Sequence, residues 1–136
     1  MEYTEVTREV AEADFDRFAR FARLKMDRKR NLIDKNDIEQ DRDYLVEEIM
    51  DGRIVIDDEG HPAVICECEE TPRVSFDFRP KGIVMKAMDM HKKDHDMAKV
   101  HAMIAEATRV PAAKLFALDA VDLRNVQVLF SMFLAQ

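Results

Sequence analysis

Apolar positions in the first part of the chain recur at helical spacing and predict a pair of helices over residues 13–52. The first helix is expected to begin at an N-cap, Asp14, and the second at Asp37, which forms a capping-box pattern with Gln40. Gly52 is suited to end the second helix, because glycine readily adopts the left-handed conformation of a C-cap. The apolar stripes are Phe15, Phe18, Ala19, Ala22 and Met26 in the first helix and Ile38, Leu45 and Ile49 in the second, with Tyr44 and Val46 beside it.

Between residues 53 and 78 the pattern changes to short apolar runs separated by turn residues. Residues 54–56 and 63–66 flank Asp57-Asp58-Glu59-Gly60-His61, which predicts a β-hairpin. Residues 74–78 then alternate strictly, with Val74, Phe76 and Phe78 on one face. We expect a small three-stranded antiparallel meander with one face exposed to water.

The last part of the chain, residues 79–136, predicts a helical subdomain of three to four helices. One helix is expected over residues 83–90, a second over residues 97–107, a short helical turn after Pro111, and a final helix capped by Asp119 and Asp122. The order of helix pair, meander and helices indicates an α+β fold. Because no linker-like segment divides the chain, we expect one domain over residues 1–136.

The final helix is apolar around most of its circumference. At 100° per residue, its polar residues Arg124, Gln127 and Ser131 occupy a narrow wedge. A helix of this kind must be covered on two sides, so we expect one side to face the preceding helices and the other a second chain. Met85 and Met88 join that surface, because methionine adapts readily to different partners. The predicted partner-binding residues are Met85, Met88, Leu129, Phe130, Phe133 and Leu134.

The net charge of −7 argues against general nucleic-acid binding, which depends on neutralising phosphates. Seven basic residues do lie between Arg17 and Arg30, and they could form a nucleic-acid-binding face. No aromatic residue interleaves with them on the polar side, and basic residues at the end of a helix suit its dipole. A solvated helix face is the preferred interpretation.

Few residue patterns along the chain are typical of catalytic or metal-binding sites. His91 and His95 stand four residues apart, as two zinc ligands on a helix would, but Lys92 occupies the position where such a motif needs glutamate. Cys66 and Cys68 are interpreted as free thiols, because zinc sites space paired cysteines differently and need further ligands. No arrangement supplies a nucleophile, a base and an oxyanion donor together. We expect no enzyme activity, no metal and no cofactor.

Hydropathy predicts no membrane segment, since no apolar run approaches the roughly 20 residues that a spanning helix needs. The first residues are acidic and polar, unlike a secretory signal peptide. We expect a cytoplasmic protein.

The segment from Val74 to Leu134 resembles the tail assembly chaperones of long-tailed bacteriophages. In that family, a strand leads into an Arg-Pro-x-Gly-like turn and then into a helix with an Ala-x-Asp motif. A second helix ends near Thr-Gly-Leu-Pro, and a Leu-Asp-Ala-x-Asp cap opens the final apolar helix. The corresponding residues here are Phe76-Asp77-Phe78-Arg79-Pro80-Lys81-Gly82, Ala87-Met88-Asp89, Ile104-Ala105-Glu106-Ala107-Thr108-Arg109-Val110-Pro111 and Leu118-Asp119-Ala120-Val121-Asp122-Leu123. Two positions depart from the family: Arg109 stands where glycine is frequent, and Lys81 replaces a capping threonine or serine.

This resemblance implies a non-enzymatic helper in the cytoplasm of a bacterial host. Such a protein coats the long tape-measure protein and recruits tail-tube subunits during assembly, and it is absent from the finished virion. We expect the chain to bind these two partners and to form a homo-oligomer through its last helix. A head–tail connector, a tail-terminator subunit and a small nucleic-acid-binding regulator are the alternatives.

Overall fold

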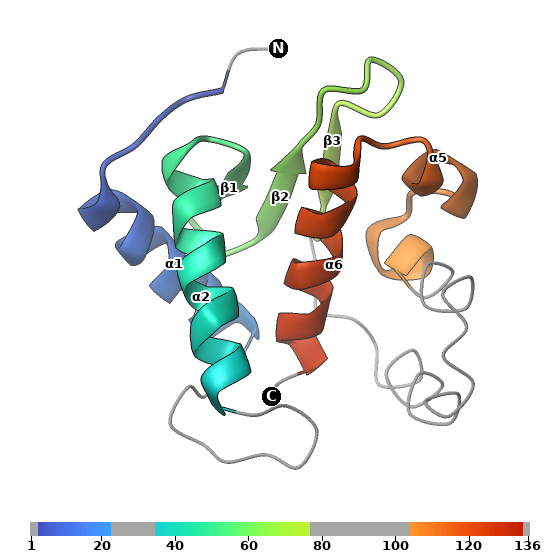
Figure 1. Ribbon diagram of the computed structural model, residues 1–136. Coiled ribbons are helices and arrows are strands. Elements are labelled where there is room, and N and C mark those ends of the chain that lie inside the picture. The colour runs from blue at the N-terminus through green and yellow to red at the C-terminus, as the bar shows by residue number, and fades with distance from the viewer. Residues whose placement is uncertain (1–2, 23–34, 77–103, 135–136) are drawn as a thin grey trace.

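The computed structural model describes residues 3–22, 35–76 and 104–134, apart from the side chains of residues 35–39 and 134. The fold is α+β, as expected (Figure 1). Its helices are α1 (Arg8–Ala22), α2 (Lys35–Met50), α5 (Ala112–Phe116) and α6 (Ala120–Leu134), and residues 104–108 are also helical. Its strands are β1 (Ile54–Ile56), β2 (Pro62–Ile65) and β3 (Arg73–Ser75).

Helix α1 begins six residues before Asp14, the N-cap that the sequence suggested. The hydroxyl of Thr7 accepts a hydrogen bond from the Val10 N–H at 3.3 Å, so Thr7 occupies the capping position. Asp14 lies inside the helix and pairs with Arg17 at 2.7 Å. The earlier start extends the buried stripe by one turn, to Ala11, which hydropathy alone does not mark as a core residue.

Helix α2 also begins earlier than expected, at Lys35, so Asp37 is not its N-cap. Its end is as predicted. Gly52 has a φ of 79°, and the N–H groups of Gly52 and Arg53 donate to the carbonyls of Ile49 and Glu48, both at 3.0 Å. These two bonds form a Schellman motif, which satisfies carbonyls that a helix end otherwise leaves without donors.

The three strands form the predicted antiparallel meander, in the order β1-β2-β3. Ile54 pairs with Val64, and Val64 pairs with Val74, so one residue of each strand lies in a continuous row across the sheet. All three side chains are fully buried, and this row therefore marks the core face of the sheet. The opposite face is partly exposed, as the alternation of residues 74–76 indicated.

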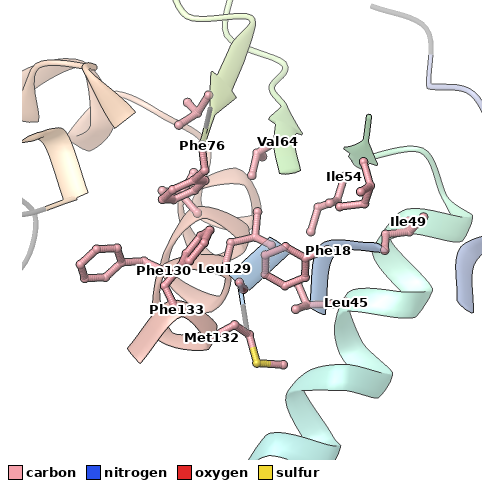
Figure 2. Close-up of a cluster of buried hydrophobic side chains, with 14 of the residues drawn as sticks. Phe18, Leu45, Ile49, Ile54, Val64, Phe76, Leu129, Phe130, Met132 and Phe133 are labelled. Carbon is pink, nitrogen blue, oxygen red and sulfur yellow. The ribbon is translucent and has the colours of Figure 1, made fainter. Parts of the chain in front are cut away.

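Helix α6 lies at the centre of the described fold, in contact with both α2 and β2 (Figure 1). In Figure 2, Phe18 of α1, Leu45 of α2, Val64 of β2 and Phe76 surround the face of α6 that carries Leu129 and Phe133. Residues between 8 and 76 thus cover this face of the apolar final helix.

The approach to α6 contains a residue in an unusual backbone conformation. Arg109 has a φ of 62°, the left-handed region that glycine adopts most readily. At this position arginine adopts a backbone conformation that glycine would adopt with less strain. Pro111 then precedes α5, and the Asp119 carboxylate caps α6 by accepting a hydrogen bond from the Val121 N–H at 3.1 Å.

Several predictions concern residues outside the described ranges, including the helix over residues 83–90, Phe78, His91 and His95. Within the described ranges, no helix has the length and apolar character needed to cross a lipid bilayer.

Candidate functional site

The residues predicted to bind a partner through α6 lie inside the chain's own core. Leu129, Phe130 and Phe133 have exposed fractions of 1%, 2% and 0%. The prediction that α6 presents a spare apolar face is therefore wrong at these three positions. Helices α1 and α2 and the sheet cover the side chains that were expected to contact a second chain. Met85, Met88 and the side chain of Leu134 lie outside the described part of the structure.

Phe133 is the centre of an aromatic cluster that joins distant parts of the chain. Its ring centroid lies 5.6 Å from Phe18, 5.9 Å from Phe21 and 5.4 Å from Phe76. The two contacts with α1 are edge-on, a geometry that aromatic quadrupoles favour. A residue in this position stabilises the monomer fold and is not available for docking.

The described residues do bring together a set of polar groups along one side of α6. Asp122 and Asn125, one turn apart on α6, are 2% and 0% exposed. Tyr44 and Glu48, one turn apart on α2, face Asn125. We call these four residues, Tyr44, Glu48, Asp122 and Asn125, the α6 polar seam.

Asn125 connects the two helices through both ends of its amide. The Tyr44 hydroxyl donates a hydrogen bond to Asn125 Oδ1 at 2.6 Å, and Asn125 Nδ2 donates to Glu48 Oε2 at 3.4 Å. Arg53 Nη1 lies 3.9 Å from the same Glu48 oxygen. Because buried polar groups are costly unless paired, this arrangement favours one register of α6 against α2.

Asp122 connects α6 to the loop that leads from β2 to β3. Its Oδ2 atom accepts a hydrogen bond from the Glu67 N–H at 3.0 Å. The sequence predicts that Asp119 and Asp122 together cap α6, and the capping hydrogen bond is made by Asp119. Asp122 instead fixes the loop next to Cys66.

Burial controls the ionisation of these groups. It raises the pKa of the Cys66 thiol to about 12, and the neighbouring acidic groups of Asp122 and Cys68 raise it further. A thiol with this pKa stays protonated near neutral pH and is a poor nucleophile. Burial, assisted by the charge of Glu48, also raises the pKa of Tyr44, although Arg124 and Arg53 oppose the shift.

A second polar group, at the tip of the β1–β2 hairpin, has a different character. Asp57 Oδ1 accepts hydrogen bonds from the N–H groups of Glu59 at 2.9 Å and His61 at 2.8 Å, and its Oδ2 lies 3.3 Å from His61 Nδ1. The ring of His61 packs edge-on against Phe21 of α1, with 4.5 Å between the centroids.

Arg17 completes the link between this tip and α1. Its guanidinium donates to the backbone carbonyls of Ile56 and Asp57, each at 3.1 Å. The sequence predicts a solvated basic face that includes Arg17, but Arg17 is half-buried and contacts the hairpin. We call Arg17, Phe21, Asp57 and His61 the hairpin-tip cluster.

Among the described residues, no three His, Cys, Asp or Glu side chains are placed to hold a metal ion. Cys66 and Cys68 are free thiols, as the sequence indicated, with Cys66 buried and Cys68 half-buried. Local sequence does not mark the seam, because Glu48 occupies a position typical of a helix surface and Asn125 belongs to no recognisable motif. The sequence signal for the seam is a pair of polar residues three apart on α6, Asp122 and Asn125, and a pair four apart on α2, Tyr44 and Glu48. Residues at these spacings lie on the same side of a helix.

Comparison of the chain with protein-family models, with curated proteins and with solved structures finds no match.

Proposed function

We propose that this chain is a tail assembly chaperone of a long-tailed bacteriophage or prophage. In this role it binds the tape-measure protein and tail-tube subunits in the cytoplasm of the bacterial host, without enzymatic activity and without a nucleic-acid or membrane partner. The observation that carries the proposal is the order of motifs from Val74 to Leu134.

The geometry of the described motifs supports the proposal. Family members often have glycine where this chain has Arg109, and Arg109 adopts the left-handed conformation that glycine serves. In the Leu-Asp-Ala-x-Asp segment, Leu118 is buried and Asp119 caps α6. Leu118 and Asp119 therefore have the core and capping roles that the Leu-Asp-Ala-x-Asp motif requires. Arg109 adopts the backbone conformation that the family's glycine serves, although its side chain differs.

The burial of α6 changes where a client is expected to bind. A chaperone needs apolar groups that an aggregation-prone partner can reach. On the described part of the matched segment, Phe116 and Val121 are the large apolar side chains that are most exposed, at 55% and 40%. We propose these two residues, together with Met85 and Met88, as client contacts in place of Leu129, Phe130 and Phe133.

The test is co-expression with the tape-measure protein encoded beside this chain. We expect the chain to increase the soluble yield of that protein and to be recovered with it. Replacement of both Phe116 and Val121 by serine should reduce the co-recovery several-fold without unfolding the chain, because neither side chain belongs to the buried core.

A matched control is Val10→Ser, which removes an apolar side chain of similar exposure, 47%, outside the matched segment. This variant should behave as the unmodified chain does. An unchanged yield of the tape-measure protein would refute the chaperone proposal. Recovery of the chain from purified virions would instead favour a permanent structural subunit.

A further inference from the structure

The two edges of the sheet differ in what covers them. At the β1 edge, the strand packs against α1 and α2, and the Arg17 guanidinium donates a hydrogen bond at 3.1 Å to the Ile56 carbonyl, which points away from β2. At the β3 edge, Arg73 is exposed and Ser75 is half-exposed. An accessible edge strand with open backbone groups is a pairing site for another strand.

The hydrogen bonds between β2 and β3 show which groups of β3 point outward. The Cys66 N–H donates to the Pro72 carbonyl at 2.9 Å, and the Phe76 N–H, at the other end of β3, also donates to β2 at 2.9 Å. Bonded and non-bonded pairs alternate along an antiparallel ladder, so Arg73 and Ser75 direct their N–H and C=O groups away from β2. The hydrogen bonds among the described residues leave these outward groups without a partner.

The outward groups of β3 are complementary to those of a second β3. When two copies run antiparallel with Val74 opposite Val74, Arg73 of each copy faces Ser75 of the other, and every outward N–H and C=O group finds a partner. This register also suits the charges, because each arginine faces a neutral serine. A register with Arg73 opposite Arg73 would bring like charges together, which is destabilising. Within one copy, Arg73 Nε donates to Ser75 Oγ at 3.1 Å, so the two side chains are compatible neighbours.

We propose that the chain forms a two-fold dimer through β3, in which the two three-stranded sheets join into one continuous antiparallel sheet. A two-fold contact uses the same edge of both copies, and the covered β1 edge then limits the assembly to a dimer. This inference is independent of the proposed chaperone function, and it places self-association at the sheet, where the sequence had suggested the last helix.

The size of the contact sets its expected strength. The strand has three residues, whereas stable interfaces typically bury at least about 1,200 Å². We therefore expect a weak dimer whose population depends on the concentration of the chain.

The first experiment measures the weight-average mass by sedimentation equilibrium, between about 10 µM and about 1 mM chain. We expect the mass to rise from that of the monomer toward twice that value. The decisive variant is Ser75→Pro. Proline removes the outward N–H and takes no hydrogen bond from β2, so the monomer should still fold. Because the two-fold axis applies each substitution twice, we expect the association constant to fall about tenfold or more.

A matched control is Ser75→Ala, which shortens the same side chain and keeps the backbone N–H. Its association constant should stay within about threefold of that of the parent. A parent chain that is monomeric at every concentration would overturn the proposal, as would equal association of Ser75→Pro and the parent. A Ser75→Pro chain that does not fold would overturn it too, because the N–H would then be needed within the monomer.

The second experiment follows amide hydrogen exchange by NMR at the two ends of the same concentration range. The Arg73 and Ser75 amides should exchange several-fold more slowly in the concentrated sample, and the Val74 amide, which bonds to β2, should not change. Exchange that is independent of concentration for all three amides would contradict the dimer. Protection of Arg73 and Ser75 that appears only when the tape-measure protein is added would assign the β3 edge to that protein and overturn the proposal.

Discussion

Asp57 and Asp122 both accept backbone hydrogen bonds, yet the protein shifts their ionisation in opposite directions. Burial also acts to raise the pKa of Asp57, but the N–H groups of His61, Glu59 and Gly60 hold it below its ordinary value. Asp57 has a side chain that is 46% exposed. Asp122 has one such N–H partner among the described residues, near-complete burial and two negative neighbours, and its pKa is raised.

This comparison shows that hydrogen bonding does not by itself decide the charge state of an aspartate. The hairpin-tip cluster surrounds a partly solvated carboxylate with several donors and favours its charged form. The α6 polar seam buries a carboxylate with few donors and favours its neutral form. The first arrangement attaches the hairpin to α1, and the second attaches the β2–β3 loop to α6.

The largest expected effect comes from Asn125→Ala in the α6 polar seam. The substitution removes the acceptor of the Tyr44 hydroxyl and a donor to Glu48, and leaves both groups in a low-dielectric region. We expect a loss of about 2–3 kcal/mol in the free energy of unfolding, measured by urea denaturation. A loss below about 0.5 kcal/mol would indicate that water replaces the amide without cost.

Ser131→Ala on the same helix is a suitable control for this substitution. The Ser131 hydroxyl donates only to the Val128 carbonyl of its own helix, at 2.7 Å, among the described residues. The change should alter stability by no more than about 0.5 kcal/mol, because it breaks no contact between elements.

The hairpin-tip cluster is expected to respond most strongly to Gly60→Ala. Gly60 has a φ of 91°, and a Cβ atom there would lie 2.5 Å from the Arg17 carbonyl oxygen and 2.9 Å from Phe21 Cβ. Backbone strain and separation of the hairpin from α1 should cost about 1–2 kcal/mol. Asp58→Ala, at the exposed neighbouring tip position, should have little effect, and equal losses for the two variants would contradict the proposed packing.

Much of the fold could be predicted from local sequence. The strand alternation placed Val74 and Phe76 in the core, and Gly52 marked the end of α2, because period and turn chemistry are local properties. The surroundings of α6 could not be predicted in this way. Its apolar circumference requires cover, but only the folded structure shows that Phe18 and Leu45, about a hundred residues away, supply it.

The burial of the α6 polar seam is also a property that local sequence does not predict. Asp122 and Glu48 each occupy positions typical of solvated residues, a helix N-terminus and a helix surface. Their burial depends on the approach of α6 to α2 and to the β2–β3 loop, which is a long-range property of the fold.

The smallest expected effect, and the most direct test of the comparison between the two aspartates, comes from Asp57→Asn. A carboxyl whose pKa is lowered by folding contributes stability above its unfolded pKa of about 3.9 and loses that contribution as pH falls through the folded value. The parent chain should exceed Asp57→Asn by less than about 1 kcal/mol at neutral pH, since solvent screens an exposed group. This difference should begin to shrink below about pH 4 and vanish once pH falls below the lowered pKa of the folded state. Because neutralising Asp122 should instead stabilise the chain at neutral pH, urea denaturation of both variants should give differences of opposite sign, and the same sign for both would refute the contrast between their environments.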